Sequence, residues 1–412
     1  MRILYLAHRI PYPPDKGEKT RCFHQVEFLS ARHSIDLFCF AASPQEAAGQ
    51  VSLGKICRSV HVEILRPRDG YVRAIRRAFN NLPASVSYYD SHLMREAVRA
   101  AIRREKYDLI FVYCSSMAQY VPLPAVAPIV IDFVDADSAK WMQYAKWSAF
   151  PKSWLYGREG RSLARYEKQV TEDFDLSIVT TPQEALDLGG GRCRAVEIVA
   201  NGVAAPPTID ASQLPEEIRQ LQPYVLFVGT MNYRPNSDAV EYFANTIFPL
   251  LRQTHPGLRF LIVGRDPGAG VKKLGSLPGV VVTGSVPEVH SYLAGAAVTV
   301  APFRIAQGVQ NKVLEALVAG IPIVLTSRPA RAIDSAAARL LLVADTPKDF
   351  ARLVRSVLEN PDLRQRSQEA ASELKQLLAW RTSLTRLEEL LESAAGIHRA
   401  GGLSVPSHVE AR

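Results

Sequence analysis

The sequence runs twice through the same alternation of short apolar strands and helices, and this repetition limits the fold more than any single motif does. In the first half the predicted strands cover residues 2–8, 35–40, 60–65, 107–114, 128–134, 175–181 and 195–199. After a connector rich in proline and small residues, Asn201 to about Gln222, the pattern restarts with strands at 224–229, 258–264, 280–283, 297–301 and 323–326. Short apolar strands separated by helices are typical of parallel sheets that are covered on both faces. We therefore predict an α/β fold with two Rossmann-like, doubly wound halves.

The length of the chain agrees with two domains, because 412 residues exceed what one ordinary hydrophobic core holds. We place an N-terminal domain at residues 1–205 and a C-terminal domain at residues 206–380. Residues 396–412 are predicted to be a disordered tail. The start of the chain is expected to form the first strand and not a signal peptide, since charged residues and a proline cluster follow directly.

Composition argues against several kinds of protein. No stretch approaches the roughly 18 to 20 uninterrupted apolar residues of a membrane-spanning helix, so we expect a cytoplasmic protein. The five cysteines are scattered and never spaced Cys-x-x-Cys, which argues against both a disulfide framework and a zinc site. No Gly-x-Gly-x-x-Gly follows the first strand of either half, which disfavours a nicotinamide dehydrogenase.

Positive charge is concentrated in one part of the chain. Between Lys55 and Lys106 there are twelve Lys and Arg residues against five acids. Apolar neighbours on two helical stretches make the basic patch at 66–106 a candidate for contact with an anionic membrane surface or a phosphorylated acceptor. A solvated helix face with extended arginine side chains explains the pattern equally well. We expect no nucleic-acid partner, because no recognition motif accompanies the charge.

Ligands of open parallel sheets bind beyond the carboxyl ends of the strands, and four strands of the second half end in suitable residues. Glycine at such a position lets the backbone approach a ligand, and the helix that follows directs free N–H groups at an anion. The positions after these strands that we single out are Gly229, Thr230, Asn232, Arg234, Gly264, Arg265, Gly284, Val286 and Arg304.

The most informative segment is residues 307–324. Gly308 leaves room for a ligand, and residues 310–311 open a helix whose free N–H groups face an anion. Lys312 adds a positive charge, and Glu315, about one turn further on, can accept two hydrogen bonds from a ribose. Taken alone, such a segment is more often a capped core helix that exposes its lysine and glutamate.

Here the sequence resembles a known family. Residues 312–324, Lys-Val-Leu-Glu-Ala-Leu-Val-Ala-Gly-Ile-Pro-Ile-Val, are similar to the donor-site signature of glycosyltransferase family 4. Residues 221–229 and 261–264 resemble the other donor-domain strands of that family. A narrower resemblance, to the sugar transferases associated with PEP-CTERM/exosortase exopolysaccharide systems, is carried by residues 9–21, 132–138, 227–236 and 310–315. The likeness extends over roughly residues 1–395.

The resemblance implies a GT-B fold, in which two domains face each other across a cleft. The N-terminal domain would lie on the acceptor side, and the C-terminal domain would bind the nucleotide-sugar donor. A last helix at about 383–395 would cross back and complete the first domain. The implied chemistry is transfer with retention of the anomeric configuration, without a metal and without a cofactor other than the substrate, a UDP- or GDP-linked sugar.

The resemblance also implies roles for particular residues. Glu315 would hold the ribose, the backbone at Gly284 and Val286 would face the base, and Gly17 would lie close to the diphosphate. The donor-binding candidates are Gly17, Thr230, Asn232, Arg234, Gly264, Arg265, Gly284, Val286, Gln307, Gly308, Gln310, Asn311 and Glu315. The catalytic candidates are Asp135 together with Arg304 and Lys312, which would neutralise the leaving diphosphate with help from Arg234.

Two positions depart from the family pattern. Gln307 stands where the family often has a glutamate, and a neutral amide cannot stabilise positive charge as a carboxylate would. Asp135 stands where the family often has a histidine at the end of an N-domain strand. Whether Asp135 contacts the donor sugar or the acceptor is left open.

The acceptor-side candidates are Lys19, Arg21, Asp132 and Asp137. The two cations follow Gly17 closely, and the aspartates gather at the end of a strand. Ordinary solvated charges and helix N-caps are the competing explanations. An aromatic segment follows at 141–156, and it is suited to stacking sugars, meeting lipid or packing under a lid.

These features predict a retaining glycosyltransferase that moves a sugar onto a polysaccharide or a polyprenyl-linked acceptor in exopolysaccharide biosynthesis, on the inner face of the plasma membrane. Two alternatives remain. One is a nucleotide-sugar epimerase of the same fold, and the other is a non-catalytic member that only binds a sugar nucleotide.

Overall fold

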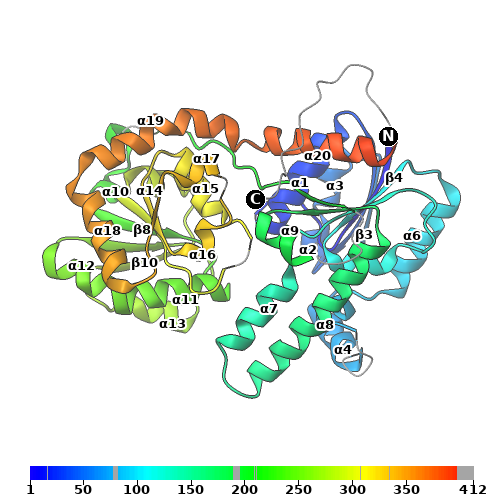
Figure 1. The fold of residues 1–412 in the computed structure, drawn as a ribbon, viewed down its shortest axis with the longest axis horizontal. Coiled ribbons are helices and arrows are strands. Elements are labelled where there is room, and N and C mark those ends of the chain that lie inside the picture. Colours follow the sequence, from blue (N-terminus) through cyan, green and yellow to red (C-terminus); the bar gives the residue numbers. More distant parts are fainter. Residues whose placement is uncertain are drawn as a thin grey trace, which may run out of the picture.

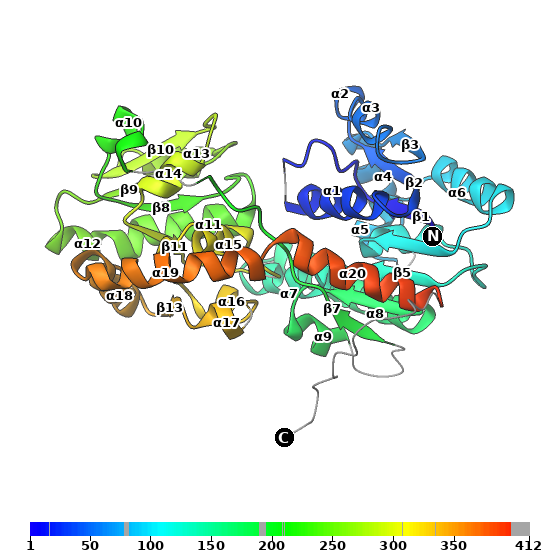
Figure 2. The same cartoon turned by 90° about the horizontal axis from the view of Figure 1, so that it is seen from above.

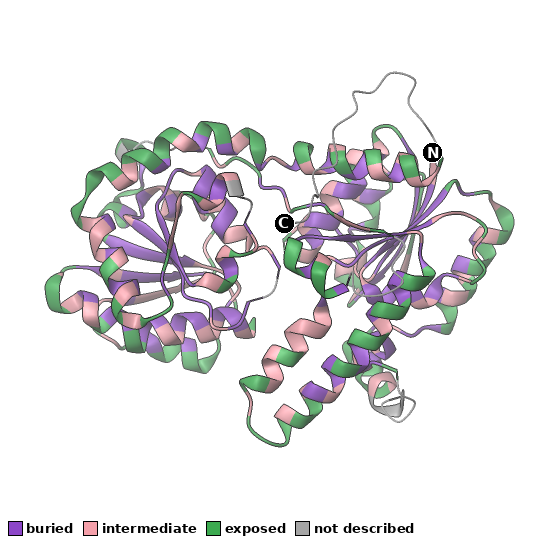
Figure 3. Cartoon of the chain, in the orientation of Figure 1, coloured by how far each residue is buried: buried purple, intermediate pink, exposed green. Residues whose placement is uncertain are grey.

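The computed structural model of the chain describes residues 1–15, 17–77, 82–188, 195–207, 209, 211–306, 308–333 and 335–396. Two halves lie side by side, and each is built on one parallel sheet with helices on both faces (Figure 1). The central strands are buried in both halves, whereas the outer faces of the helices are exposed (Figure 3). The predicted α/β fold with two Rossmann-like, doubly wound halves is confirmed.

The N-terminal half contains a seven-stranded sheet in the order β3-β2-β1-β4-β5-β6-β7, with all neighbouring strands parallel. Its strands are β1 (Arg2–Ala7), β2 (Ser34–Ala41), β3 (Ser59–Ile64), β4 (Leu109–Tyr113), β5 (Ile129–Asp132), β6 (Leu176–Val179) and β7 (Val196–Ile198). Its helices are α1 (Gly17–Ser30), α2 (Pro44–Ala47), α3 (Gln50–Leu53), α4 (Pro67–Arg77), α5 (Ala84–Tyr88), α6 (His92–Arg104), η1 (Ser115–Tyr120), α7 (Asp137–Lys146), α8 (Lys152–Asp173) and α9 (Pro182–Leu188). The central strands are almost wholly apolar because helices cover them on both sides.

The C-terminal half contains a six-stranded parallel sheet in the order β10-β9-β8-β11-β12-β13. Its strands are β8 (Tyr224–Val228), β9 (Arg259–Val263), β10 (Val280–Gly284), β11 (Val298–Ala301), β12 (Ile323–Leu325) and β13 (Leu341–Val343). Its helices are η2 (Ala211–Gln213), α10 (Glu216–Arg219), α11 (Arg234–Tyr242), η3 (Phe243–Ile247), α12 (Phe248–Thr254), α13 (Ala269–Leu274), α14 (His290–Gly295), α15 (Asn311–Val318), α16 (Ser327–Ala330), α17 (Ser335–Ala338), α18 (Pro347–Glu359) and α19 (Pro361–Leu377). The strand order changes direction between β1 and β4 and between β8 and β11, the places where such sheets bind ligands.

Two chain segments cross between the halves next to each other. Val203, in the segment that leaves the N-terminal half, donates its N–H to the carbonyl oxygen of Leu378, in the segment that returns to it (2.7 Å). A β-carbon on Gly202 would lie 2.4 Å from the Cα of Trp380, so only glycine fits against the returning segment. The last helix, α20 (Trp380–Ala394), then lies on the N-terminal half (Figure 2).

Helix α20 belongs to the hydrophobic core of the N-terminal half. Its apolar face, which includes Leu384, Leu387 and Leu391, packs into the core cluster that contains residues of β1 and β2. Buried Glu388 accepts hydrogen bonds from Arg32 (2.7 Å) and pairs with His33 (3.0 Å) at the end of α1. The described part of the chain therefore begins and ends in the same half.

Candidate active site

Three glycines stand in a row where β8, β9 and β10 end. Gly264 has φ +151°, and a β-carbon there would lie 1.7 Å from the carbonyl oxygen of Gly229, so no other residue fits. The N–H of Gly264 donates to the carbonyl oxygen of Gly284 (3.1 Å), which itself has φ +72° and open space around it. At these three positions the edge of the sheet carries no side chains, so a ligand can approach the backbone closely.

Lys312 projects from the first turn of α15 onto the same edge. Its Nζ donates to Oδ1 of Asn236 on α11 (2.6 Å) and lies over the rings of Phe227 (4.3 Å) and Phe303 (4.8 Å). A β-carbon on Gly229 would lie 2.9 Å from this ammonium. Burial lowers the pKa of Lys312 to about 7. The nearby carboxylate of Glu315 opposes this lowering, but the hydrogen bond of the ammonium within the described residues goes to the neutral Asn236 amide, which an anionic ligand can supplement.

The N-termini of α1 and α15 meet where the two halves join. A β-carbon on Gly17, the first residue of α1, would lie 3.8 Å from Nδ2 of Asn311, the first residue of α15. The side chain of Asn201 donates to Oδ1 of Asn311 (3.1 Å) and ties the start of α15 to the interdomain connector. The first N–H groups of a helix lack partners within the helix and carry partial positive charge. Two such ends at one place favour an anion between them.

Asp135 touches Gly308 across the junction. Gly308 has φ +63°, and a β-carbon there would lie 1.9 Å from Oδ1 of Asp135, so the carboxylate occupies the space of that side chain. The loop after β5 presents Asp135 through a turn at Val134 (φ +66°), in which the N–H of Asp135 donates to the carbonyl oxygen of Phe133 (2.8 Å). Burial, together with the nearby carboxylate of Glu184, raises the pKa of Asp135 well above its usual value.

The contact at Gly308 yields a stability prediction. In Gly308→Ala the positive φ costs about 1–2 kcal/mol, and the clash with Asp135 should add about 1 kcal/mol or more. Gly396→Ala is the matched control, because Gly396 has φ +72° and nothing within 4 Å of its β-carbon position. Thermal melting should show the larger loss for Gly308→Ala. Adding Asp135→Ala to that variant should restore part of the loss, and no restoration would contradict the contact.

Glu315 lies one turn after Lys312 on α15. Burial raises the pKa of Glu315, while Lys312 and His290 at the start of α14 oppose the rise. Glu288 closes the first turn of α14 by accepting the N–H of Ser291 (2.8 Å) and of His290. A carboxylate next to two basic side chains can accept hydroxyl hydrogen bonds, as the predicted ribose contact requires.

The structure places Arg304 away from Lys312. Its guanidinium forms a two-point pair with Asp238 (Nε–Oδ2 3.0 Å, Nη2–Oδ1 2.5 Å) and lies over the rings of Tyr242 and Trp147. Asp238 and the Lys312 partner Asn236 are two residues apart on α11, so they point to different sides of that helix. The prediction that Arg304 neutralises the diphosphate is therefore not supported, because its charge is already paired.

Three further donor-side candidates hold the halves together or lie at the rim. Arg234 donates to the carbonyl oxygen of Trp147 (2.8 Å) and to Oγ of Ser148 (3.0 Å), both in the N-terminal half. Arg265 donates to Oδ2 (3.1 Å) and to the carbonyl oxygen (2.6 Å) of Asp15. Asn232 lies 3.4 Å from Asp266 on the surface. These contacts connect the domains and leave neither arginine pointing at the glycine row.

The remaining donor-side candidates lie around the glycine row. The carbonyl oxygen of Thr230 accepts from Asn236 (2.9 Å), and Val286 packs against the core cluster around Leu226 and Val263. Gln310 is the N-cap of α15. Gln307 lies outside the described residues.

Three acceptor-side candidates prove to be buried structural residues. Arg21 (1% exposed) donates to Asp132 (0% exposed) from Nε (2.9 Å) and Nη2. Its other N–H groups reach Asn201 (2.8 Å) and the carbonyl oxygen of Val199 (2.9 Å). Lys19 is 4% exposed and forms an ion pair with Glu46. The structure gives no support to the predicted acceptor contacts of Lys19, Arg21 and Asp132, because their side chains are enclosed and paired within the protein.

Asp137 is different, since it borders a hollow of about 190 Å³ at the carboxyl ends of β1 and β4. Its other walls are His8, Arg9, Glu18, Ser85, Tyr89, Cys114, Ser115 and Ser116. The ring of His8 stacks on Tyr113 (5.9 Å between centroids), and burial lowers its pKa to about 4. Nδ1 of His8 has no hydrogen-bond partner among the described residues, so a neutral imidazole faces the hollow with a free polar atom.

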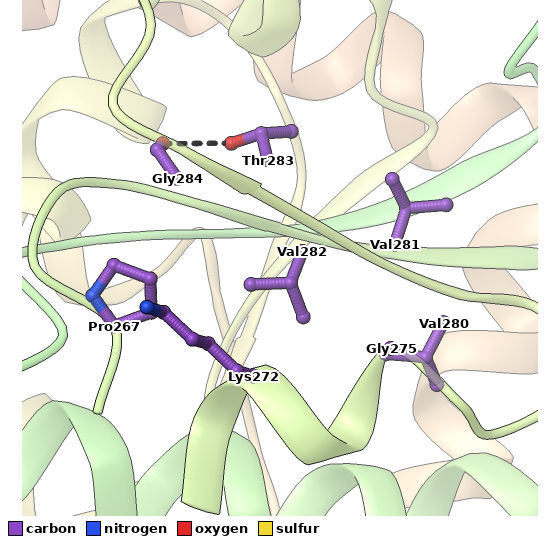
Figure 4. Close-up of a pocket in the computed structure, with 8 residues that line it drawn as sticks. All are labelled: Pro267, Lys272, Gly275, Val280, Val281, Val282, Thr283 and Gly284. Atoms are coloured by element: carbon purple, nitrogen blue, oxygen red, sulfur yellow. Dashed lines mark hydrogen bonds between the residues drawn. The ribbon is translucent and has the colours of Figure 1, made fainter. Parts of the chain in front are cut away.

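A second hollow, of about 550 Å³, lies along edge strand β10 beside α13 (Figure 4). Its walls are Pro267, Lys272, Gly275 and residues 280–284. The hydroxyl of Thr283 donates to the carbonyl oxygen of Gly284 (2.9 Å) at one end of it. Among the donor-side candidates that the structure describes, Gly284 alone borders this hollow. The hollow is therefore separate from Lys312.

Sequence reasoning missed the partners that position the site. Asn236 has the residue type of a helix N-cap, but α11 begins at Arg234 and the Asn236 amide instead holds Lys312. His8 was not among the predicted site residues. Neither contact has a local signal, because the partners come from segments that are distant in the sequence.

Comparison with known proteins places this geometry in context. Residues 222–360 match the family model described as Glycosyl transferases group 1. No curated protein matches the chain in sequence.

Several solved structures share the fold of the whole chain. Sucrose-phosphate synthase from Thermosynechococcus elongatus superposes with a TM-score of 0.71 and 16% identity, over 97% of this chain and 100% of the other. HepE from Anabaena, solved in complex with UDP, superposes with a TM-score of 0.66 and 15% identity, over 95% of this chain and 100% of the other. WaaG, a glycosyltransferase involved in lipopolysaccharide biosynthesis, superposes with a TM-score of 0.62 and 16% identity, over 94% of this chain and 99% of the other. The chain thus has the GT-B fold of these enzymes, its C-terminal half matches a glycosyltransferase family, and both findings support a glycosyltransferase.

Proposed function

We propose that the chain is a retaining glycosyltransferase of family 4 and that the diphosphate of its nucleotide-sugar donor binds where the N-termini of α1 and α15 meet. The observation that carries this proposal is the position of Lys312, whose ammonium lies beside Gly229 with only a neutral hydrogen-bond partner, Asn236. A dianionic leaving group matches two positive helix ends and one unpaired cation.

Each group near the junction then has a role. The bond between the anomeric carbon and the diphosphate oxygen breaks, and the diphosphate leaves with the electron pair. The acceptor hydroxyl oxygen bonds to the anomeric carbon, and its proton passes to an oxygen of the departing diphosphate. Lys312 and the first N–H groups of α15 stabilise the charge on the departing oxygens. Asp135 borders the donor sugar from the N-terminal half, and Glu315 holds the ribose.

We place the acceptor in the hollow beside His8. Hydroxyl, carboxylate and imidazole groups line it, and Arg9 is already paired with Glu18 (3.2 Å). Such a lining suits the hydroxyl groups of a saccharide. Glu18 follows Gly17 directly, so the hollow lies next to the proposed diphosphate position.

The donor is proposed to be UDP-linked or GDP-linked. HepE structures contain UDP, UDP with glucose, and UDP-glucose, which favours the uridine nucleotide for a protein of the same fold. A polyprenyl-linked acceptor in exopolysaccharide synthesis would bring this chain to the cytoplasmic face of the membrane. Exposed basic side chains in the 66–106 patch support such a location; they are Arg66, Arg68, Arg99, Arg103, Arg104 and Lys106. Residues 78–81 of that patch lie outside the described residues.

Nucleotide release decides between the proposal and its alternatives. The protein is incubated with a panel of nucleotide sugars, with and without a polyprenyl-linked or saccharide acceptor. Release that requires the acceptor is the expected result. A changed sugar without release would identify an epimerase, and binding without either reaction would identify a non-catalytic protein.

Glu315→Ala should weaken binding of the donor nucleotide about 10- to 100-fold, because a hydrogen bond to a charged acceptor contributes about 1.5–3 kcal/mol. Calorimetric titration with UDP measures the dissociation constant. Glu369→Ala, an exposed glutamate on α19, is the control and should bind like the parent. An unchanged dissociation constant for Glu315→Ala would refute the ribose contact.

A further inference from the structure

Helices α7 and α8 form an antiparallel hairpin that projects from the N-terminal half (Figure 1). The α7 side of the hairpin contacts the C-terminal half. Gln143 accepts the N–H of Ala306 (3.2 Å), and the carbonyl oxygen of Trp147 accepts from Arg234. The tip, residues 146–155, begins at these contacts, because Arg234 also donates to Oγ of Ser148 (3.0 Å).

The tip exposes large apolar side chains to solvent. Phe150 is 83% exposed, Trp154 57% and Leu155 51%. The neighbouring Met142 (45%) and Trp147 (44%) extend the apolar surface along α7. In the part of the chain that the structure describes, the rings of Phe150 and Trp154 stack on no other ring. These apolar side chains therefore stay in contact with water in the folded chain. This contact costs free energy unless a partner or a lipid surface covers them.

The exposed charge of the hairpin has one sign except at the far end of α8, where Glu172 and Asp173 are exposed. Over residues 138–171 the sequence contains two acids, Glu159 and Glu167, and both are buried. Glu159 accepts hydrogen bonds from the backbone N–H groups of Ala84 (2.8 Å) and Ser85 (2.9 Å). The exposed charged residues in the same range are all basic: Lys146, Lys152, Arg161, Arg165 and Lys168.

Aromatic side chains beside lysines are the composition of protein surfaces that lie at a membrane–water interface. Indole rings sit at the level of the headgroups, and lysine stems extend over apolar surface while the ammonium stays in water. An anionic surface complements five exposed cations, whereas a second copy of the same tip would repel them. Helix α4, with exposed Arg68 and Tyr71, lies on the same side of the molecule as the hairpin (Figure 1).

We propose that the tip of the α7–α8 hairpin, residues 146–155, docks into the headgroup region of an anionic lipid surface. Phe150, Trp154 and Leu155 enter the interface, and Lys146 and Lys152 contact the lipid phosphates. The start of the tip also contacts the C-terminal half through Arg234, so docking positions the domain junction close to the lipid surface. The binding step requires neither donor nor acceptor, and it can be tested separately from the proposed enzyme activity.

Vesicle sedimentation of the full chain tests this proposal. The probes are phosphatidylcholine vesicles with and without phosphatidylglycerol. The parent should sediment with the anionic vesicles, and Phe150→Ser with Trp154→Ser should lower the partition coefficient about tenfold or more. Lys146→Glu with Lys152→Glu should lower it by a similar factor at low salt. Leu186→Ser, on α9, is the matched control, because Leu186 is 74% exposed and lies away from the tip.

Two results would overturn the proposal. The first is equal sedimentation of the parent and the Phe150/Trp154 variant while melting temperatures are unchanged. The second is a lipid-free dimer of the parent, seen by sedimentation velocity, that the same variant converts to monomer, since the tip would then bind a second copy. A blue shift of tryptophan fluorescence on vesicle addition, reduced in Trp154→Phe, would support insertion of the tip.

Discussion

Replacing Lys312 with methionine should lower kcat for sugar transfer about 10²- to 10³-fold, the usual effect of removing one group that stabilises transition-state charge. Methionine keeps much of the length and the apolar stem, so Phe227 and Phe303 remain covered. It also removes a buried ammonium, and the variant should melt no lower than the parent. A loss of kcat in a stable protein would therefore report lost charge stabilisation and not unfolding.

The pH dependence of donor binding gives a second readout of Lys312. Its pKa of about 7 lies far below the usual value because of burial, so the side chain is charged below pH 7 and neutral well above it. The affinity of the parent for UDP should fall as the pH rises through about 7, since a neutral amine attracts no diphosphate. In Lys312→Met this decline should be absent. Lys348→Met, an exposed lysine on α18, should behave like the parent, and an equal loss of kcat in both variants would contradict the role of Lys312.

Replacing Asp132 with alanine should lower the free energy of unfolding by about 3–5 kcal/mol, the cost of leaving one partner of a buried ion pair alone. Asp132 accepts from Arg21 and also from Nε2 of Gln25 (2.6 Å), whose amide oxygen accepts from Tyr5 (2.7 Å). Without the carboxylate, the guanidinium of Arg21, which is 1% exposed, keeps its charge but has lost its anionic partner. Urea denaturation measures the effect.

The chain contains a matched control for this ion pair. Asp238 and Arg304 form the same two-point contact, but their side chains are 22% and 37% exposed. Asp238→Ala should therefore cost only about 0–1 kcal/mol. If Asp132→Ala instead kept full stability and raised only the KM for the acceptor, Asp132 would be an acceptor contact and our structural interpretation of it would be wrong.

The fold was accessible from the sequence because its signals are local. Most buried strands are continuous or nearly continuous apolar runs, and α15 has a glycine before it and a Gly-Ile-Pro stop after it. Strand β13 (Leu341–Val343) escaped prediction, because it is a three-residue edge strand with no buried residue. Helix α7 also buries none of its side chains, so it has no apolar stripe from which a helix could be predicted.

The site was less accessible, because burial of charge depends on partners that are far apart in the sequence. Arg21, near the start of α1, and Asp132, at the end of β5, have the residue types of a binding site, yet they are separated by 111 residues and neutralise each other. Lys312 and Asn236, 76 residues apart, look from the sequence like an exposed lysine and a helix cap. Only the packed structure distinguishes a cation that is already paired from one that is available.

A crystal structure of the protein with UDP tests the central claim most directly. We predict that the diphosphate oxygens lie within hydrogen-bond distance of Lys312 Nζ and of the first backbone N–H groups of α15. A diphosphate bound in the hollow along β10, beside Lys272, with Lys312 still held only by Asn236, would contradict the account.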